Sequence, residues 1–590
     1  MTALSAIARR VLEARYLRRD AQGRVIETPE ELVARVARAT AQAELLLGTA
    51  RQADHWQERF AALLGSLDFL PNSPALMNAG TPLGQLCACF VLPIEDSLEA
   101  IFDALRAMAL VQRSGGGTGF AFSRLRPRDD LLGSTGGRAS GPVSFMRVFD
   151  AATENIKLGG RRRGANMAVL RIDHPDIEEF VTVKCDGRSL QNFNLSVGVT
   201  DAFMDAVTVD GMHELIHPST QRVVGRMRAR QLFDRLVEAA WTSGDPGLLF
   251  LDAVARADPL PSLGPIEATN PCGEVPLRPF GSCVLGSVNL AHMLRGPEGQ
   301  EEIDWERLRA TVHAGVRFLD DLLEVTREPL PEIAAVTRAS RSIGLGVMGF
   351  AELLLRLGVS YADEAAVTWA DRVAGFVAEE ARQASRQLAE ERGVFPAWEQ
   401  SRHGARGDRL RNASCCSIAP TGTLSLIAGT SASIEPLFAL VYRREHTLGG
   451  PPFVETNPIF LRAVASLGAA GEALLAHVRA HGTLDGAPVD PALARRFATA
   501  LTVSPAQHLR VQQAFQRHVD NAVSKTVNLP AAATPSDVAA VYLDAWRLGL
   551  KGVTVYRYGS APGQVLTLGA EEEPAARELF ARCDPAACRL

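Results

Sequence analysis

Hydrophobic residues recur along this chain with helical spacing in some stretches and strand spacing in others. In ETPEELVARVARATAQAE the apolar positions follow helical spacing, and Thr28 with Glu31 three residues later forms a capping-box pattern. LEAIFDALRAMALVQR has the same spacing, and Asp96 or Ser97 stands before it as a good N-cap. We therefore expect a helical region over residues 1–48 and an amphipathic helix directly after Ser97.

A strand pattern precedes that second helix. Residues 71–97 begin as a loop rich in Pro, Asn and Gly and continue as the short apolar run CACFVLPI. Side chains of a strand alternate between its two faces, so Cys87 and Cys89 are expected on the same face. Two thiols on one face are open to two interpretations, simple core packing or thiol chemistry.

The second half of the chain also mixes the two periods. Residues 362–393 predict a long helix, residues 508–530 a helix followed by a strand, and residues 551–560 a further strand. Beyond about residue 560 the composition changes to GAEEEPAARE, which is acidic and poor in core formers, as in a flexible linker. Periodicity alone predicts a large α/β protein with a tail over residues 561–590.

Composition narrows the class of protein. The 590 residues are 47% hydrophobic and 22% charged, with a formal net charge of −5, which is typical of a soluble globular protein. There is no domain-wide basic excess to indicate nucleic-acid binding. The start, MTALSAIARRVLEARYLRRD, lacks the apolar core of a signal peptide, and no apolar run reaches membrane-spanning length. We expect a cytoplasmic protein that binds neither nucleic acid nor membrane.

The cysteines indicate chemistry rather than crosslinking. There are nine of them in a long chain without a signal peptide, which argues against a disulfide framework. A zinc site is disfavoured because the chain does not contain two CxxC pairs. Redox or radical chemistry fits this cysteine usage better.

The stretch NPCGEVPLRPFGSCVLGSVNL, residues 270–290, concentrates polar groups in a tight loop. Pro271 fixes one backbone angle and Gly273 frees another, so the segment from Asn270 to Glu274 suits a loop. Such a loop can direct an amide, a thiol and a carboxylate toward one point. The alternative is a turn around a buried structural cysteine. With a reference pKa of about 4.3, Glu274 is expected to be ionised at neutral pH without a large shift.

Two thiols belong to this stretch. Cys272 lies within the loop, and Cys283 follows eleven residues later. The apolar residues Val275 and Leu277 lie between them, so a strand can return Cys283 to the vicinity of the loop.

Two glycine-rich stretches are candidates for contact with anions. SGGGTGF, residues 114–120, is a tight turn that matches neither a Walker loop nor a dinucleotide fingerprint. KLGGRRRGANM contains Arg161, Arg162 and Arg163 between glycines, which suits a mobile loop that contacts phosphates or bases. The alternative for the second stretch is a solvated run of charge.

Residues 344–349 satisfy the pattern G-x-G-x-x-G, and FAELLLRL follows as a helix. A dinucleotide site requires a hydrophobic strand directly before the motif, and RASRSI is a poor strand. We therefore expect these glycines to allow close packing of a helix.

Residues 420–425, PTGTLS, place hydroxyls and free amides at the expected start of a helix. Helix N-termini bind phosphate through unsatisfied amides and the local dipole. The alternative is an ordinary turn rich in Ser and Thr. Cys415 and Cys416 adjoin this segment and are expected to be structural.

Together, NPCGE, FVLP, GGRRRGAN, PTGT and the terminal cysteines resemble the ribonucleotide reductases, and most of all their adenosylcobalamin-dependent class. The resemblance covers nearly the whole chain. It implies a ten-stranded α/β barrel of two five-stranded halves over residues 49–560, with NPCGE on a finger loop through its centre. The implied reaction replaces the ribonucleotide 2′-hydroxyl by hydrogen, with adenosylcobalamin as the source of the radical.

The resemblance also implies the roles of individual residues. Cys272 is implied to bear the thiyl radical, Glu274 to accept the 3′-hydroxyl proton, and Asn270 to hydrogen-bond the ribose hydroxyls. Cys89 and Cys283 are implied to supply the reducing equivalents, while the choice between Cys87 and Cys89 stays open. Substrate binding is implied for Ser73, Ala88, Gly117, Pro420, Thr421, Gly422, Thr423 and Ser425.

Partners follow from the same resemblance. A deoxynucleotide effector is implied to bind near Asp96 and Ser97, with a specificity loop at Arg161, Arg162 and Arg163. The helix after Ser97 is implied to build a homodimer interface. On the tail, Cys583 and Cys588 are implied to re-reduce the active site and to be reduced in turn by thioredoxin or a similar dithiol. The implied substrates are diphosphates.

Three rival functions remain. A catalytic subunit that needs a separate metal-containing radical subunit should have two adjacent tyrosines in the last strand, whereas this chain has Val555-Tyr556-Arg557. A glycyl-radical reductase lacks the Asn-Cys-Glu grouping. A non-catalytic deoxynucleotide-binding regulator should have lost part of that grouping.

Overall fold

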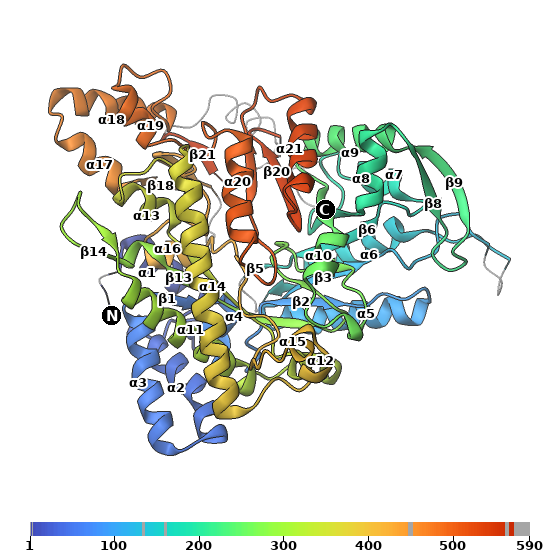
Figure 1. The fold of residues 1–590 in the computed structure, drawn as a ribbon, viewed down its shortest axis with the longest axis horizontal. Helices are drawn as coiled ribbons and strands as arrows, with labels where there is room; N and C mark the ends of the chain where they lie inside the picture. Colours follow the sequence, from blue (N-terminus) through green and yellow to red (C-terminus); the bar gives the residue numbers. More distant parts are fainter. Residues whose placement is uncertain are drawn as a thin grey trace.

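Three helices form the region that begins the chain in this computed structural model, which describes residues 2, 4–131, 136–158, 162–445, 452–560 and 566–570. They are α1 (Ala6–Arg15), α2 (Pro29–Leu47) and α3 (Ala50–Gly65). The predicted capping box at the start of α2 is confirmed, because Thr28 and Glu31 bond each other's backbone amides. α2 and α3 pack together as a hairpin, so the helices continue past residue 48 (Figure 1).

Ten strands form one large sheet, in the order β1-β13-β2-β3-β6-β7-β10-β20-β19, with β16 paired to β13. The bounds of these strands are β1 Phe69–Pro71, β2 Cys89–Leu92, β3 Gly117–Ala121, β6 Asn166–Arg171, β7 Phe193–Val199, β10 Gly247–Phe250, β13 Ser282–Asn289, β16 Ile343–Met348, β19 Thr526–Leu529 and β20 Gly552–Arg557. The expected α/β fold with a ten-stranded sheet is confirmed.

The sheet has two parts of opposite direction. Strands β2, β3, β6, β7 and β10 are parallel and form the first half. At one end of this half, β13 pairs antiparallel with β2 and parallel with β16. At the other end, β20 pairs antiparallel with β10 and parallel with β19. The segment of Cys416 and Ile418 lies between β16 and the residues that precede β19. It pairs with β16 at Leu345–Cys416 and with the chain before β19 at Ile418–Val523.

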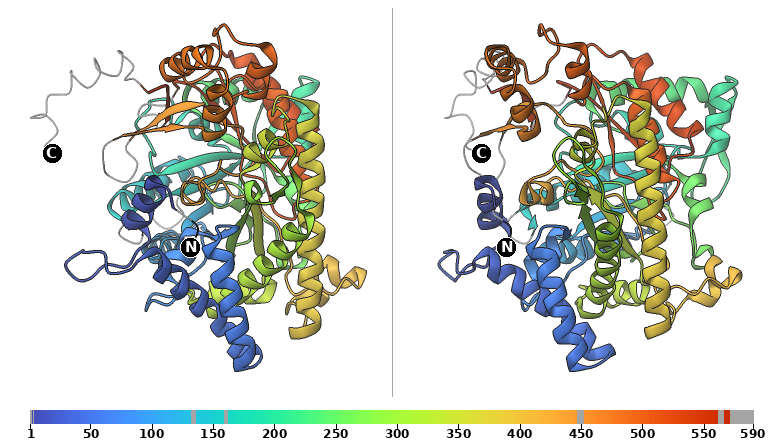
Figure 2. Two further views of the ribbon diagram at one scale, coloured as in Figure 1. Left: turned by 90° about the vertical axis from the view of Figure 1, so that its left-hand side faces the viewer. Right: turned by 60° about the vertical axis from the view of Figure 1, so that its left-hand side comes forward.

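Helices surround the sheet, and the longest lie beside the second half. α11 (Trp305–Val325) packs on β13 and β16, and α14 (Glu364–Arg392) packs across α11 and α20 (Pro505–Gln516). α9 (Ala229–Ser243) and α21 (Pro535–Arg547) cover β20. Figure 2 shows α14 as the long yellow helix along one side of the molecule. The predicted long helix, and the predicted helix and strand over residues 508–530, are confirmed.

Shorter elements complete the chain. The remaining helices are α4 Ser73–Asn78, α5 Leu98–Arg113, α6 Pro142–Asn155, α7 Ile177–Thr182, α8 Asp201–Thr208, α10 Leu251–Ala257, α12 Pro331–Ser340, α13 Phe350–Arg356, α15 Arg402–Arg406, α16 Leu424–Ala428, α17 Pro458–Ala465, α18 Ala469–His481 and α19 Pro491–Arg496. Paired strands outside the large sheet are β4 Lys157–Leu158, β5 Arg162–Arg163, β8 Met212–Ile216, β9 Val223–Arg228, β11 Ala268–Thr269, β12 Pro276–Leu277, β14 Leu294–Arg295, β15 Glu302–Ile303, β17 Val441–Arg444, β18 Phe453–Thr456 and β21 Leu566–Leu568. Among the described residues, no helix is both long and apolar enough to cross a membrane.

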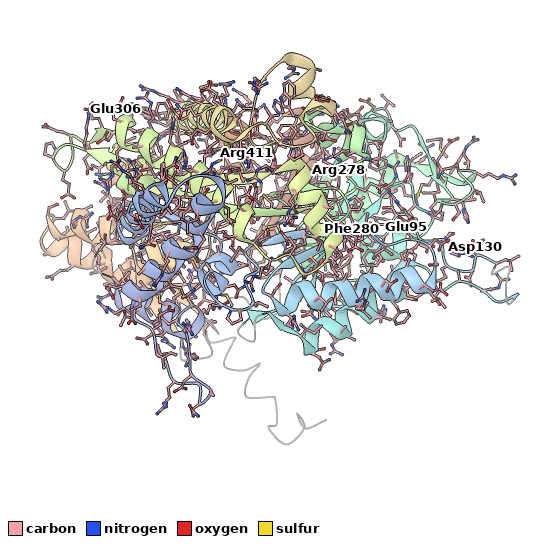
Figure 3. The ribbon with its side chains drawn as sticks, turned by 90° about the horizontal axis from the view of Figure 1, so that it is seen from below. Glu95, Asp130, Arg278, Phe280, Glu306 and Arg411 are labelled. Carbon is pink, nitrogen blue, oxygen red and sulfur yellow. The ribbon has the colours of Figure 1, made fainter. Side chains whose placement is uncertain are left out.

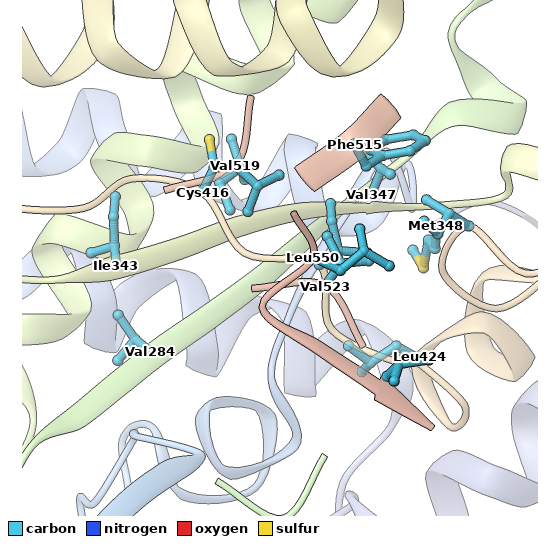
Figure 4. Close-up of a cluster of buried hydrophobic side chains, with 14 of the residues drawn as sticks. Val284, Ile343, Val347, Met348, Cys416, Leu424, Phe515, Val519, Val523 and Leu550 are labelled. Atoms are coloured by element: carbon cyan, nitrogen blue, oxygen red, sulfur yellow. The ribbon is translucent and has the colours of Figure 1, made fainter. Parts of the chain in front are cut away.

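The hydrophobic core joins strands of the second half to the helices outside them. Val284 of β13 and Ile343 and Val347 of β16 are fully buried, together with Phe515 of α20 and Val523. Figure 4 shows these side chains in one cluster with Cys416 and Leu550. Burial of this kind stabilises by about 25 cal/mol per Å² of apolar surface.

Five of the six residues of the pattern G-x-G-x-x-G lie in β16, and Gly349 is the N-cap of α13, which corrects the expected helix packing. A Cβ on Gly344 would lie 2.3 Å from the Leu285 side chain, and one on Gly346 would lie 2.3 Å from the Ser417 carbonyl oxygen. The glycines therefore let β13 and the segment at Ser417 approach β16 closely.

A buried ionic cluster joins the helical region to the barrel. Asp320 of α11 accepts hydrogen bonds from Arg341 (2.7 Å) and Arg392 (2.9 Å), and Arg392 also bonds Glu44 of α2 (2.7 Å). Arg411, labelled in Figure 3, belongs to the same cluster. Burial opposes ionisation of Asp320, but the surrounding arginines outweigh it and hold its pKa below the usual value.

We expect Asp320→Ala to lower the free energy of unfolding by about 3–5 kcal/mol, because it leaves buried arginines without their counter-charge. Glu306, labelled in Figure 3, provides a matched control, since its carboxylate pairs with Arg309 but its side chain is 76% exposed. Glu306→Ala should change stability by less than about 1 kcal/mol. Urea denaturation followed by circular dichroism measures both, and equal losses would contradict the assignment.

Candidate active site

The loop at residues 270–274 closes a short hairpin between β11 and β12. Asn270 stabilises the loop with its side chain and its backbone. The Val275 amide donates to Asn270 Oδ1 (3.0 Å), and the Gly273 amide donates to the Asn270 carbonyl (3.1 Å). Gly273 has φ +82°, a conformation that an L side chain rarely adopts. The predicted tight loop is confirmed.

This finger loop lies against β3 because two glycines leave room for it. A Cβ on Gly119 would lie 1.8 Å from the Thr269 carbonyl oxygen, and one on Gly117 would lie 2.9 Å from the Pro271 ring. The Gly117 amide also donates to the Ala88 carbonyl (2.8 Å). Gly117 and Ala88, to which the sequence assigned substrate binding, thus lie directly behind the loop.

An amide and a carboxylate of the loop meet at its base, as predicted, but the thiol that joins them is Cys89 of β2 and not Cys272. Asn270 Nδ2 donates to Glu274 Oε2 (2.7 Å) and to Cys89 Sγ (3.2 Å). The Cys89 thiol also lies 3.8 Å from Glu274 Oε1. All three side chains are buried, so these contacts form away from bulk water.

Burial changes the acidity of Glu274. Desolvation raises its pKa to about 7, and the hydrogen bond from Asn270 only partly offsets this. The expectation of an ionised carboxylate without a large shift is therefore wrong. A carboxyl group with a pKa of about 7 can both accept and release a proton near neutral pH.

Cys89 and Cys283 lie directly opposite each other on the antiparallel strands β2 and β13. Opposite residues of such a pair point to the same face, with Cβ atoms roughly 4.5–5.5 Å apart. Both belong to one buried cluster, and burial followed by the nearby charge of Glu274 raises the pKa of each thiol. Both sulfurs are therefore held as neutral thiols.

Cys87 lies in a different environment, which corrects the expectation that it shares a face with Cys89. It precedes β2 rather than belonging to the strand, so strand alternation does not apply. Its thiol donates to Glu328 (3.1 Å) and lies 3.4 Å from Ser282. Ser282 and Cys283 are neighbours in β13 and point to opposite faces, so Cys89 is the better partner for Cys283.

Cys272 is exposed at the tip of the loop, whereas Asn270 and Glu274 beneath it are buried. It lines a cavity of about 820 Å³ together with Gly273. Strands β7, β10, β19 and β20 form the walls, and Tyr556 of β20 is among the lining residues. The thiol thus faces an open space large enough for a sizeable molecule.

The remaining substrate-site candidates lie at the start of α4 and around the start of α16. In the segment 420–425, α16 begins after Thr423, which confirms the predicted helix start. Arg15 of α1 donates to Thr423 Oγ1 (3.0 Å), and Tyr16 shares a hydrogen bond with Ser73 Oγ (2.8 Å). Ser73 and Thr423 are therefore brought together at the end of α1.

The predicted effector residues lie at the start of α5. Ser97 is its N-cap and accepts from the Ala100 amide (3.1 Å), while Asp96 pairs with Arg126 (2.8 Å). Arg162 and Arg163 form β5 of a short hairpin with β4. Arg161 lies outside the described residues, as do Cys583 and Cys588 of the tail. The stretch from residue 561 includes an ordered strand, β21, which pairs with β17.

Two supporting residues escaped prediction from the sequence. Asn194 Nδ2 donates to the Pro271 carbonyl (2.7 Å), and Ser417 Oγ donates to the Glu274 carbonyl (2.9 Å). Both hold the backbone of the loop from strands or segments distant in sequence. No local spacing marks such residues, because their role depends on which strands become neighbours.

Comparison with known proteins agrees with this geometry. Residues 2–84 match the family model "Ribonucleotide reductase, all-alpha domain", and residues 87–556 match "Ribonucleotide reductase, barrel domain". Vitamin B12-dependent ribonucleoside-diphosphate reductase of Mycobacterium tuberculosis is 54% identical over 96% of this chain and 81% of its own length. The enzyme of that name from Thermoplasma acidophilum is 44% identical, with the same coverages.

Among solved structures, the Actinobacillus ureae class Id ribonucleotide reductase alpha subunit has the same fold. Its TM-score is 0.76 at 22% identity, over 94% of this chain and 97% of the other. The finger loop with its Asn-Cys-Glu grouping, the ten-stranded sheet and the two family matches lead to one conclusion: the chain belongs to the ribonucleotide reductase family.

Proposed function

We propose that this chain reduces ribonucleoside diphosphates to 2′-deoxyribonucleotides, the precursors of DNA, in a reaction that depends on adenosylcobalamin. The observation that supports it most is the position of Cys272, exposed on a large cavity directly above the buried Asn270, Glu274 and Cys89. The names of the relatives at 54% and 44% identity support the cofactor and the diphosphate substrate.

The cavity fits a large cofactor beside Cys272. Its volume of about 820 Å³ and its open side leave room for part of a molecule as large as a corrinoid. The residues that would hold the cofactor line the walls and supply hydroxyl and amide groups: Asn194, Ser196, Thr242, Asn528, Thr554 and Tyr556. These groups suit the amide substituents of a corrin ring. When bound, adenosylcobalamin supplies the radical chemistry.

The residues of the finger loop then act on the ribose. Cys272 Sγ exchanges a hydrogen atom with the 3′ carbon of the substrate. Glu274 accepts the proton of the 3′-hydroxyl, for which a pKa of about 7 is well matched to neutral pH. Asn270 orients the carboxylate through its 2.7 Å hydrogen bond and binds the ribose hydroxyls.

Cys89 and Cys283 supply the reducing equivalents. Their two S–H groups provide two electrons and two protons, the 2′-hydroxyl leaves as water, and the sulfurs become a disulfide. Their opposite positions on β2 and β13 suit this bond, because they approach without rearrangement of the strands. The protonated state of both thiols keeps the hydrogens available until the substrate is activated.

Re-reduction and regulation complete the proposal. Cys583 and Cys588 exchange with the Cys89–Cys283 disulfide and are reduced in turn by thioredoxin or a similar dithiol. A deoxynucleotide effector binds near Asp96, and α5 contributes to a homodimer interface. The exposed apolar side chains Leu98 and Phe102 on α5, 61% and 54% exposed, support the interface.

The cofactor requirement is tested with the purified full chain, cytidine diphosphate and a dithiol, with and without adenosylcobalamin. We expect deoxycytidine diphosphate only when the cofactor is present. Cys272→Ser should abolish product and retain substrate binding, because a hydroxyl does not replace the thiol in one-electron chemistry. Cys185→Ser is the matched control, since this exposed thiol lines the same cavity, and it should retain activity. Activity in Cys272→Ser would contradict the assignment.

The pKa of Glu274 predicts a pH dependence. The base must be ionised, so the rate constant of a single turnover by prereduced enzyme should fall about tenfold per unit as the pH drops below about 7. Glu274→Gln should remove most of the activity. Glu328→Gln is the matched control, because it alters a half-buried carboxylate that accepts a hydrogen bond from the Cys87 thiol, and the rate should still fall at low pH. A rate that is flat between pH 5.5 and 8 would exclude Glu274 as the base.

The tail makes a separate prediction. Cys583→Ser should block multiple turnovers with thioredoxin and spare them with a small dithiol, because a small reductant reaches the barrel disulfide without the tail. Steady-state rates with the two reductants measure the difference. Equal loss with both reductants would remove the shuttle role from Cys583.

A further inference from the structure

The end of α1 contacts Ser73 at the start of α4 and Thr423 at the start of α16, to which the family resemblance assigned substrate binding. Arg15, the last residue of the helix, donates from Nη1 to Thr423 Oγ1 at 3.0 Å. Tyr16, its C-cap, shares a 2.8 Å hydrogen bond with Ser73 Oγ. α1 also packs on α16, the helix that follows Thr423, and the two labels lie side by side in Figure 1.

Local structure holds these groups in place. Tyr16 is 1% exposed, so burial of its ring pins the end of α1 to the barrel. In the opposite loop, Thr421 has φ +48°, and its hydroxyl oxygen accepts from the Ser433 amide (2.7 Å). A residue rarely adopts this conformation unless its surroundings impose it. The loop and the helix end are therefore both fixed before a ligand arrives.

The positive charge of Arg15 beside residues 420–425 indicates that this part of the site binds an anion. The segment 420–425 offers hydroxyls and backbone amides, and α16 beyond it has only five residues, so its dipole is small. A diphosphate has more than one negative charge, and Arg15 brings a guanidinium to this loop. A guanidinium presents several donors in a plane that matches phosphate oxygens. Its position at the C-terminus of a helix also favours the positive charge.

We propose that Arg15 binds the diphosphate group of the substrate, and that Tyr16 positions Ser73 for the same group. The inference rests on the proposed reduction of ribonucleotides and adds the N-terminal helix to its substrate site. The hydrogen bond between Arg15 and Thr423 holds the guanidinium beside the loop, where it contacts the diphosphate that the loop binds. The helical region thereby contributes directly to recognition of the substrate.

The test measures equilibrium binding of cytidine diphosphate to full-length Cys272→Ser enzyme without cofactor, with cytidine as the uncharged comparison. We expect Arg15→Ala to weaken binding of cytidine diphosphate about tenfold or more and to leave cytidine unchanged. In the active background, the KM for cytidine diphosphate should rise by a similar factor while kcat is retained. Tyr16→Phe keeps the ring, removes the hydroxyl and should raise KM about threefold.

Two further variants separate charge from packing. Arg15→Lys keeps the charge and should restore part of the affinity, whereas Arg15→Gln keeps a hydrogen-bond donor without charge and should behave like Arg15→Ala. Arg9 is exposed on the same helix, so Arg9→Ala is the matched control and should bind as wild type. Thermal melts confirm that each variant is folded.

The outcomes separate this inference from the proposed function. Wild-type enzyme that reduces cytidine diphosphate, with unchanged KM and binding in both Arg15→Ala and Arg15→Gln, would overturn the role of Arg15 alone. Equal weakening of cytidine and cytidine diphosphate would also overturn it, because the contact would not be with phosphate. Wild-type enzyme that reduces no ribonucleotide under any condition would reject the proposed function instead.

Discussion

The buried contact between Asn270 and Glu274 is the constraint on which the site depends. Taking a carboxylate out of water opposes its ionisation, and this raises the pKa of Glu274 to about 7. The amide of Asn270 limits the shift and fixes the direction of the carboxylate at 2.7 Å, while also reaching the Cys89 thiol. Burial thus sets the acidity of the base, one buried amide limits the shift and orients both the carboxylate and a thiol, and the exposed Cys272 faces the cavity.

The strand β3 leaves space for the finger loop to pack against the sheet. Gly117 and Gly119 of β3 have no side chains to occupy the space that Pro271 and Thr269 fill. From the other side, the Ala522 amide donates to the Glu274 carbonyl (2.9 Å). The loop therefore packs between β3 of the first half of the sheet and the segment that precedes β19 of the second half. An error of an ångström in either half would displace the reacting groups, and glycines, backbone bonds and the side chains of Asn194 and Ser417 together define the position of the loop.

Two of the contacts that join the helical region to the rest of the chain have different consequences. The charges of Glu44, Arg392 and Asp320 fasten α2 to α11 and α14 away from the site, where pairing of buried charges serves stability. The end of α1 reaches Thr423 and Ser73, where Arg15 bonds Thr423 and Tyr16 bonds Ser73. The same region therefore combines a structural joint with a contact in the substrate site.

The sequence by itself determined the helices with strong periodicity, the tight loop at residues 270–274 and the residue types of its chemistry, because spacing and turn chemistry are local. The tertiary structure alone decided that Cys89 rather than Cys87 faces Cys283, since strand β2 begins only at residue 89. It also decided the acidity of Glu274, which depends on the atoms that exclude water around it. The contact of Arg15 with a loop more than four hundred residues away depends on packing between distant segments, which no local pattern encodes.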